Sequence, residues 1–141
     1  MRISAYINVF RNHFSGFGGA KLQKSNPKTR CTKRNLSKST DVCRCYNDLQ
    51  SAYAEILQAS DDVESFTCNL PLRGLEIGDY TSDFYIRRTS GSFAVRECVS
   101  RKHLIKPMTV RILDASRDYW YRRGVTDWGV VTNKETNHVQ G

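Results

Sequence analysis

A hairpin with an acidic residue at the open end of each strand constrains the fold more than any other stretch of this sequence. Residues 80–88 and 93–99 carry alternating apolar side chains, and residues 89–92 (Thr-Ser-Gly-Ser) between them are typical of a tight turn. In an antiparallel pair, the start of the first strand lies beside the end of the second. We therefore expect Asp83 and Glu97 to be neighbours in the folded protein.

Two neighbouring carboxylates can share one divalent cation, Mg²⁺ or Mn²⁺. Metal-dependent nucleases use this arrangement, because oxygen ligands hold the metal beside the scissile phosphate and a nearby cation stabilises the attacking water or the charged phosphate. Asp83 and Glu97 are therefore candidate metal ligands and catalytic residues. An ordinary hairpin with exposed acids at its ends is the alternative interpretation.

The hairpin segments 80–84 (Tyr-Thr-Ser-Asp-Phe) and 93–99 (Phe-Ala-Val-Arg-Glu-Cys-Val) resemble the core of PD-(D/E)xK nucleases. The similarity is to the TnsA-like endonucleases of bacterial transposons, and it extends to residues 61–66 (Asp-Asp-Val-Glu-Ser-Phe) and 69–71 (Asn-Leu-Pro). This resemblance implies a restriction-endonuclease-like α/β fold with the two acids as metal ligands. It also implies DNA cleavage in transposition or DNA processing, with Mg²⁺ or Mn²⁺ as cofactor and a transposase subunit as a partner.

Two functional positions depart from the family pattern. Gln50 stands where the family's helix has a glutamate, and Val99 stands where it has the catalytic lysine. A neutral amide can orient a water or a ligand but binds Mg²⁺ more weakly than a carboxylate does. A replacement cation would come from Arg101, which shares the strand parity of Glu97 if the strand continues, or from Lys102 or Lys106 in the following segment. Arginine is a poor proton-transfer group, because it keeps its proton.

The net charge of +8 is concentrated at the start of the chain. Residues 1–45 hold ten Lys and Arg and one Asp, whereas residues 46–141 hold twelve basic and thirteen acidic side chains. This asymmetry predicts a basic, DNA-contacting arm over 1–45 and a nuclease-like α/β domain over 46–141. A solvated tail that keeps the protein in solution is the alternative. The candidate DNA contacts are Lys21, Lys24, Lys28, Arg30, Lys33, Arg34 and Lys38.

The remaining pattern predicts a mixed β-sheet flanked by helices. Apolar residues at helical spacing predict an amphipathic helix over 48–59 and a second over 107–123, where Met108, Ile112, Ala115 and Tyr119 form the expected buried stripe. Residues 63–70 and 125–132 are expected to add strands to the hairpin, and residues 3–10 form a short strand or a helical turn.

Composition narrows the protein class. No apolar run approaches the length of a membrane span, and the first residues lack the long apolar centre of a signal peptide, so we expect a cytoplasmic protein that does not bind membranes. Five cysteines in such a chain indicate reduced thiols rather than a disulfide framework. Cys31, Cys43 and Cys45 are the plausible zinc ligands, but their spacing is poor for a tetrahedral site.

The sequence therefore leaves two function classes open. The first is a Mg²⁺-dependent DNA endonuclease in which Asp83 and Glu97 hold the metal and Gln50 assists. The second is a nuclease-derived module that has lost cleavage and binds DNA or a transposase partner. The fold is shared by both classes, so the fold cannot choose between them.

Overall fold

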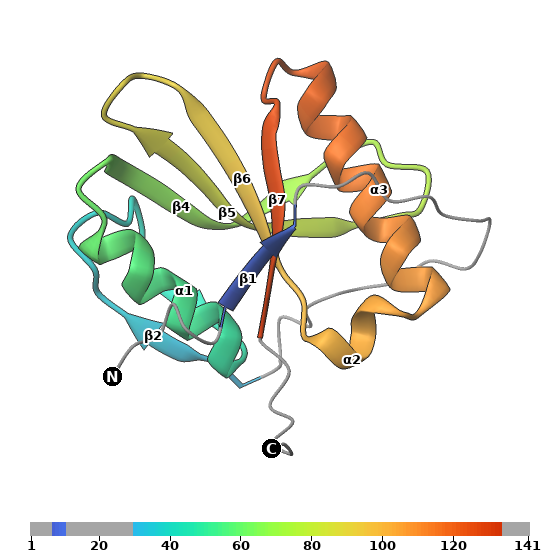
Figure 1. The fold of residues 1–141 in the computed structure, drawn as a ribbon, viewed down its shortest axis with the longest axis horizontal. Coiled ribbons are helices and arrows are strands. Elements are labelled where there is room, and N and C mark those ends of the chain that lie inside the picture. The colour runs from blue at the N-terminus through green and yellow to red at the C-terminus, as the bar shows by residue number, and fades with distance from the viewer. Residues whose placement is uncertain (1–6, 11–29, 134–141) are drawn as a thin grey trace.

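The computed structural model of this protein describes residues 7–10, as backbone, and residues 30–133. The fold is α/β, as the sequence predicts. A five-stranded mixed sheet in the order β1-β7-β6-β5-β4 forms its centre, and a separate two-stranded sheet pairs β2 with β3. The helices α1 (Asp48–Ala59) and α3 (Pro107–Arg122) cover opposite faces of the large sheet (Figure 1).

Three consecutive antiparallel strands form most of the large sheet: β4 (Val63–Leu72), β5 (Tyr80–Arg88) and β6 (Phe93–Cys98). The chain then passes through the short helix α2 (Arg101–Leu104) and through α3, and returns as β7 (Asp127–Asn133) parallel to β6. Strand β1 (Ile7–Phe10) pairs antiparallel with β7 at one edge of the sheet. The predicted strands and both predicted long helices are confirmed, and residues 7–10 form a strand.

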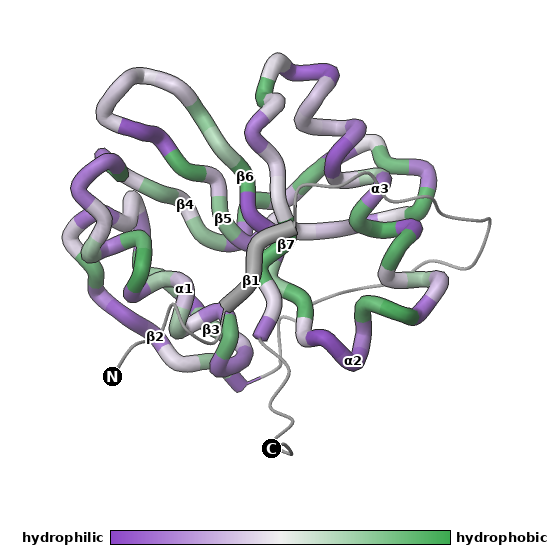
Figure 2. The backbone as a smooth tube through the Cα atoms, viewed as in Figure 1, coloured by the Kyte–Doolittle hydropathy of each residue, from purple (hydrophilic) through white to green (hydrophobic). Residues whose placement is uncertain are grey.

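The hydrophobic core lies in two parts, one on each face of the sheet. Helix α1 begins after Asn47, whose side-chain oxygen accepts the backbone N–H of Gln50 at 2.8 Å. Its buried Tyr53 packs edge-to-face on Phe84 of the sheet. Figure 2 shows hydrophobic and hydrophilic stretches alternating along α1 and α3, as expected for helices that each bury one face.

Helix α3 buries a face one position away from the predicted stripe. Its buried residues are Ile112, Leu113, Ser116 and Trp120. Tyr119, which the apolar spacing assigned to the core, is half-buried, and Trp120 takes the core position instead. The reason is that the Trp120 ring stacks on Tyr85 of the sheet with ring centroids 5.1 Å apart. Trp120 carries a larger apolar ring system than Tyr119 does, so it gains more by burial.

The predicted boundary at residue 45 does not coincide with an edge of the folded body. Residues 30–45 contain β2 (Thr32–Arg34) and β3 (Cys43–Cys45), and both Cys43 and Cys45 are buried in the core beneath α1. The backbone around Ser39 also pairs with Phe66 of β4. Cys43 and Cys45 lie two residues apart, so a strand places both of these small apolar side chains on the same face, toward the core. Residues 11–29 of the predicted arm lie outside the described residues.

No helix within the described ranges is long and apolar enough to cross a membrane.

A buried arginine ties β6 to the start of β7. The Arg96 side chain is 2 % exposed, and its guanidinium donates to Asp127 Oδ1 at 2.8 Å and to the backbone oxygens of Val95 and Asp127. Arg88 donates to the other oxygen of the same carboxylate, at 2.9 Å. Burial alone would raise the pKa of Asp127, but the positive charges of Arg96 and Arg88 outweigh it, and the pKa lies below its ordinary value.

We predict that Asp127→Asn lowers the free energy of unfolding by about 2 kcal/mol, because Arg96 loses its charged partner inside the protein. The folded-state pKa of Asp127 lies below the unfolded value. Its contribution to stability is therefore complete above the unfolded pKa and is lost as pH falls through the folded one. Urea unfolding between pH 7 and pH 3 should show that the variant has a shallower acid dependence than the unmodified protein.

The matched control is Glu64→Gln, which removes the exposed ion pair between Glu64 and Arg87. An exposed pair contributes about 0–1 kcal/mol, so this variant should unfold almost as the unmodified protein does. Equal destabilisation of the two variants would contradict the structural role of Asp127.

Candidate functional site

The two hairpin acids lie side by side, as the sequence predicts. The ladder between β5 and β6 ends at the pair Phe84 and Arg96, one position before the acids. There the carboxylates take over the role of backbone carbonyls. The N–H of Asp83 donates to Glu97 Oε1 at 3.0 Å, and the N–H of Cys98 donates to Asp83 Oδ2 at 2.6 Å. The two acids therefore hold the strands together where the backbone pairing stops.

Gln50 reaches the same place from α1. Its amide nitrogen donates to Asp83 Oδ1 at 3.2 Å and to Asn69 Oδ1 at 3.0 Å, and its amide oxygen accepts the N–H of Tyr46 at 2.8 Å. The side chain is 2 % exposed. Because the Tyr46 N–H fixes which end of the amide is the oxygen, the nitrogen must face the acid. The structure thus brings together Gln50, Asp83 and Glu97 from three separate segments.

Glu97 is also bound by two hydroxyl groups from different elements of the fold. Its Oε2 accepts hydrogen bonds from Ser82 Oγ of β5 and from Ser116 Oγ of α3, each at 2.6 Å. Each hydroxyl oxygen in turn accepts an indole N–H, from Trp120 at 2.9 Å and from Trp128 at 3.1 Å. An indole nitrogen can only donate, so each serine must turn its own proton toward the carboxylate. The result is a one-way relay of donors that ends on Glu97.

Tyr80 completes the surroundings of the acids. Its ring is buried, and the pKa of its hydroxyl is well above the ordinary value because burial and the negative charges of Glu97 and Asp83 disfavour the phenolate. The hydroxyl also hydrogen-bonds Glu97. Tyr80 therefore stays protonated and serves as a donor rather than as a base.

These residues do not fit a Mg²⁺ ion as they are arranged. Glu97 is 0 % exposed and Asp83 is 4 % exposed, and their carboxylate oxygens already accept hydrogen bonds from Ser82, Ser116, Gln50 and two backbone N–H groups. Mg²⁺ keeps several water ligands and requires octahedral geometry, which a buried pair of hydrogen-bonded acids does not offer. Within residues 30–133, no three His, Cys, Asp or Glu side chains group as metal ligands do.

The position of the family's lysine is apolar in structure as well as in sequence. Val99 is 9 % exposed and packs in the core cluster on the α3 side, with Leu113 and Trp120 among its members. Strand β6 ends at Cys98, and Ser100 precedes the first turn of α2, so the strand does not continue to residue 101. The parity argument for a replacement cation at that position therefore fails.

Two of the proposed stand-in cations begin helix α2. The backbone N–H of Arg101 donates to Asn133 Oδ1 at 3.0 Å, and Lys102 is exposed. Nearby, His103 Nδ1 hydrogen-bonds the Ser100 hydroxyl at 2.9 Å. Desolvation is the largest cause that lowers the pKa of His103 below its ordinary value, and repulsion from Lys106 and Lys102 adds to it.

The predicted DNA contacts divide into three groups. Lys21, Lys24 and Lys28 lie outside the described residues. Arg30 and Lys33 are exposed at the surface of the described body.

The third group, Arg34 and Lys38, holds the β2–β3 segment onto α1. Arg34 donates to the oxygens of Ser51 and pairs with Glu55, both on α1. The Lys38 ammonium donates at 2.6 Å to the carbonyl of Ser60, where α1 ends, and so complements the negative end of the helix dipole. These two cations are bound within the protein, which makes them poorer candidates for phosphate contact than Arg30 and Lys33.

Sequence reasoning missed Ser82, Ser116 and the two tryptophans of the relay. Ser116 lies four residues after Ile112 and four before Trp120, in the middle of the buried face of α3. A small hydroxyl residue at a core position of a helix needs a hydrogen-bond partner, and this requirement is the signal that could have identified it.

The sequence matches no protein-family model, and no curated protein is significantly similar to it.

We predict that Ser116→Ala lowers the free energy of unfolding by about 1–3 kcal/mol, because Glu97 loses one donor and the Trp128 indole loses its acceptor while both stay buried. Urea unfolding followed by tryptophan fluorescence measures the change. The control is Ser90→Ala at the exposed hairpin turn, where a change within about 0.5 kcal/mol is expected. A Ser116→Ala variant as stable as this control would contradict the relay.

Proposed function

We propose that this chain is a DNA-binding module with a nuclease-like fold that acts in DNA transposition or processing without cleaving DNA itself. The order of elements supports the nuclease-like part of the proposal. A helix, three antiparallel strands, a second helix and a strand parallel to the third follow one another as the family resemblance implies. The convergence of Gln50, Asp83 and Glu97 at one point of that framework supports it further.

The proposal that the chain does not cleave DNA rests on the burial and the hydrogen bonds of Glu97. A carboxylate that holds a catalytic metal must present oxygen lone pairs to a site that water and phosphate can reach. Glu97 is fully buried, and its oxygens are bound by Ser82, Ser116 and the Asp83 N–H. The apolar Val99 two residues later supplies no cation. The acids therefore act as structural acceptors that hold β5, β6 and α3 together.

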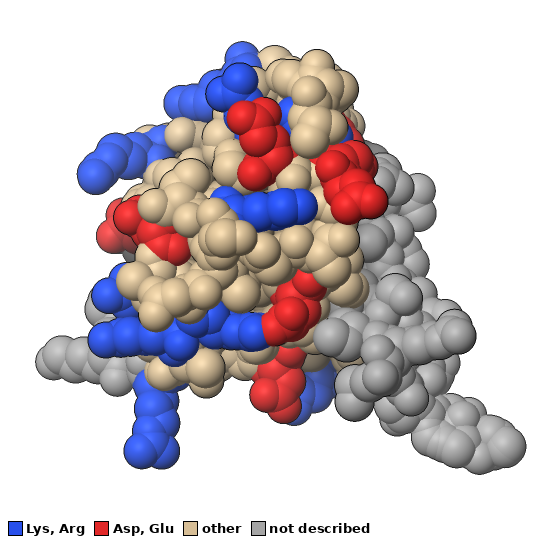
Figure 3. All heavy atoms as spheres, turned by 90° about the vertical axis from the view of Figure 1, so that its left-hand side faces the viewer, with Lys and Arg blue, Asp and Glu red and all other residues tan. Residues whose placement is uncertain are grey.

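The charge distribution supports DNA as the partner. Residues 30–133 contain sixteen basic and thirteen acidic side chains, so most of the net charge of +8 belongs to the rest of the chain. Figure 3 shows one face of the described body, where basic and acidic side chains alternate rather than form one basic field. We assign the phosphate contacts to Lys21, Lys24 and Lys28, together with the exposed Arg30 and Lys33. A transposase subunit is the protein partner that the family resemblance suggests.

A Mg²⁺-dependent endonuclease is the second candidate function. It is favoured by one observation, which is that the three sequence-predicted site residues do meet. Cleavage would require Ser82 and Ser116 to release Glu97, and it would require the acids to become open to water. We therefore propose DNA cleavage only for a form of the site in which Ser82 and Ser116 no longer bind Glu97.

We predict that Mg²⁺ and Mn²⁺ titrated into the full chain give no binding heat, and that the protein does not nick supercoiled plasmid in either metal. The reason is that both acids are buried and already accept hydrogen bonds from protein donors. The same protein should bind duplex DNA in fluorescence anisotropy.

The control for this experiment is Asp83→Asn, which keeps the shape of the side chain and removes its charge. Metal-dependent cleavage by the unmodified protein that disappears in Asp83→Asn would overturn the proposal and establish the endonuclease.

We also predict that replacing Lys21, Lys24 and Lys28 together by Gln weakens duplex binding. The slope of log affinity against log salt concentration should become shallower by about 0.9 for each phosphate that the variant no longer neutralises. The control is the triple replacement of Arg73, Arg87 and Arg122 by Gln, which changes the net charge equally on the described body. Equal effects of the two triple variants would show that total charge, rather than the predicted arm, determines the binding.

A further inference from the structure

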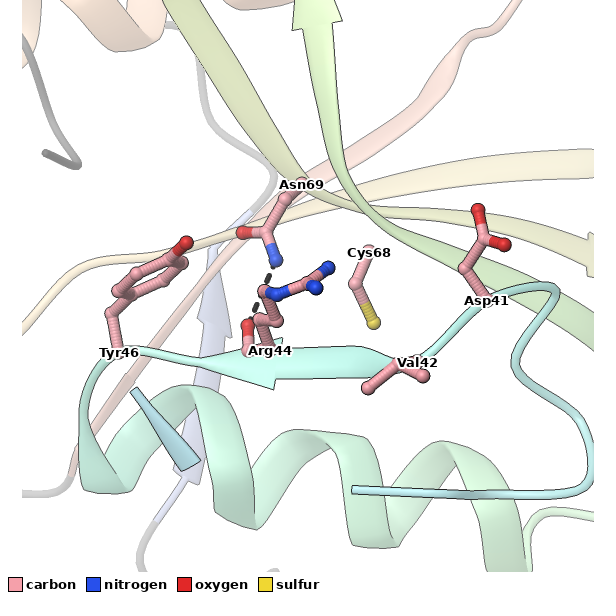
Figure 4. A pocket seen from close by; sticks show the side chains of 6 residues that line it. All are labelled: Asp41, Val42, Arg44, Tyr46, Cys68 and Asn69. Atoms are coloured by element: carbon pink, nitrogen blue, oxygen red, sulfur yellow. Dashed lines mark hydrogen bonds between the residues drawn. The ribbon is translucent and has the colours of Figure 1, made fainter. Parts of the chain in front are cut away.

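A hollow of about 520 Å³ lies between residues 41–46 and strand β4 (Figure 4). Neither the sequence pattern nor the acidic site accounts for it. Its volume is in the range of pockets that hold small molecules. It is lined by Asp41, Val42, Arg44, Tyr46, Cys68 and Asn69.

The hollow forms because the two backbones that border it are joined at two separated points. At one point the N–H of Thr40 donates to the carbonyl of Phe66 at 2.9 Å. At the other, Asn69 Nδ2 donates to the carbonyl of Arg44 at 2.8 Å, a bond drawn in Figure 4. Asn69 has a φ of 56°, a left-handed conformation that asparagine tolerates better than most residues. A side-chain amide thus spans the gap that backbone pairing would otherwise close.

One cation projects into this space. The Arg44 guanidinium points into the hollow in Figure 4, and within the described part of the chain its side chain makes no hydrogen bond or ion pair. Other arginines of the described body, such as Arg34, Arg88 and Arg96, form ion pairs with carboxylates. A guanidinium presents a planar set of donors that matches the oxygens of a phosphate. Arg44 therefore provides an anion-binding group at the centre of the hollow.

The walls on either side of Arg44 have different chemistry. Tyr46 places an aromatic ring at one end, and Val42 is an apolar side chain that is 40 % exposed. Aromatic rings of this kind stack on nucleic-acid bases whatever the base, since every base has a flat π-face. Asp41 lies at the end of the hollow opposite Tyr46. Its negative charge disfavours a second phosphate there, so a phosphate on Arg44 leaves the Tyr46 end for the base.

We propose that this hollow binds a nucleotide, with the phosphate on the Arg44 guanidinium and the base against Tyr46. The assignment of that nucleotide to a DNA strand rests on the proposed function, whereas the chemistry of the hollow does not. The hollow also connects to the acids. Asn69, which borders it, accepts the same Gln50 amide that donates to Asp83. Asn69 in the wall of the hollow is therefore linked to the Asp83 carboxylate by two hydrogen bonds that share the Gln50 amide.

The first experiment is an NMR titration of the full chain with 5′-phosphorylated thymidine dinucleotide, with the unphosphorylated dinucleotide and with thymidine monophosphate. The phosphorylated dinucleotide should shift the amide signals of residues 41–46, Cys68 and Asn69. Arg44→Gln should weaken this binding at least tenfold, and the control Arg73→Gln, an exposed arginine after β4, should leave it unchanged. Tighter binding of the dinucleotide identifies a DNA strand as the source, and tighter binding of the monophosphate identifies a free nucleotide.

Absence of shifts at these residues, or equal binding by the unmodified protein and Arg44→Gln, overturns the inference. The Arg44 side chain is exposed and its backbone carbonyl, not its guanidinium, holds Asn69, so the variant keeps that hydrogen bond. Its amide spectrum away from the hollow provides the check that it is folded.

The second experiment separates this inference from the proposed function. In duplex DNA anisotropy, Arg44→Gln should reduce the salt slope by about one, and Arg73→Gln should not. If Arg44→Gln leaves duplex binding unchanged and the NMR titration shows no shifts, the nucleotide site is overturned while the proposed DNA-binding function stands. If the unmodified protein does not bind duplex DNA but nucleotides shift the signals at the hollow, the proposed DNA-binding function is overturned and the nucleotide site is supported.

Discussion

The buried carboxylate of Glu97 is the interaction on which the arrangement of this fold depends. An ionised group inside a protein is costly unless hydrogen bonds replace the water that it loses. Glu97 receives them from Ser82 and the Asp83 N–H of β5 and from Ser116 of α3. The Trp128 indole of β7 holds the Ser116 hydroxyl in turn. One side chain of β6 therefore fixes the positions of two neighbouring strands and of the helix between β6 and β7.

This arrangement has a consequence for chemistry. The Glu97 lone pairs that accept protein hydrogen bonds are ones that a metal ion would use, so Glu97 as bound here has little capacity left for a metal. The hydrogen bonds that position the strands and α3 thus occupy Glu97, which agrees with the proposed module that does not cleave DNA. The neutral Gln50 and the apolar Val99 have the same effect, because the first satisfies Asp83 with an N–H and the second packs in the core.

Local patterns were sufficient to predict most of the elements and the meeting of the two acids. The turn at 89–92 sets the register of the hairpin, and the register places Asp83 opposite Glu97. The relay to Ser116 could not be predicted, because it joins residues from β5, β6, α3 and β7, and no local spacing encodes that contact. The burial of Cys43 was missed for a related reason. The segment around Cys43 is rich in positive charge, and charge indicates which partners a segment can bind but not whether it packs in the core.

A path of hydrogen bonds runs from the surface hollow at Arg44 to the buried Asp83. Asn69 donates to the Arg44 carbonyl on one side and accepts the Gln50 amide on the other. The Gln50 oxygen is held by the Tyr46 N–H, so both walls of the hollow contact the residue that binds Asp83. A carboxylate in place of Gln50 could accept the Tyr46 N–H but could not donate to Asn69 or Asp83. The amide is therefore the side chain that joins the hollow to the acids, and a glutamate would break that connection.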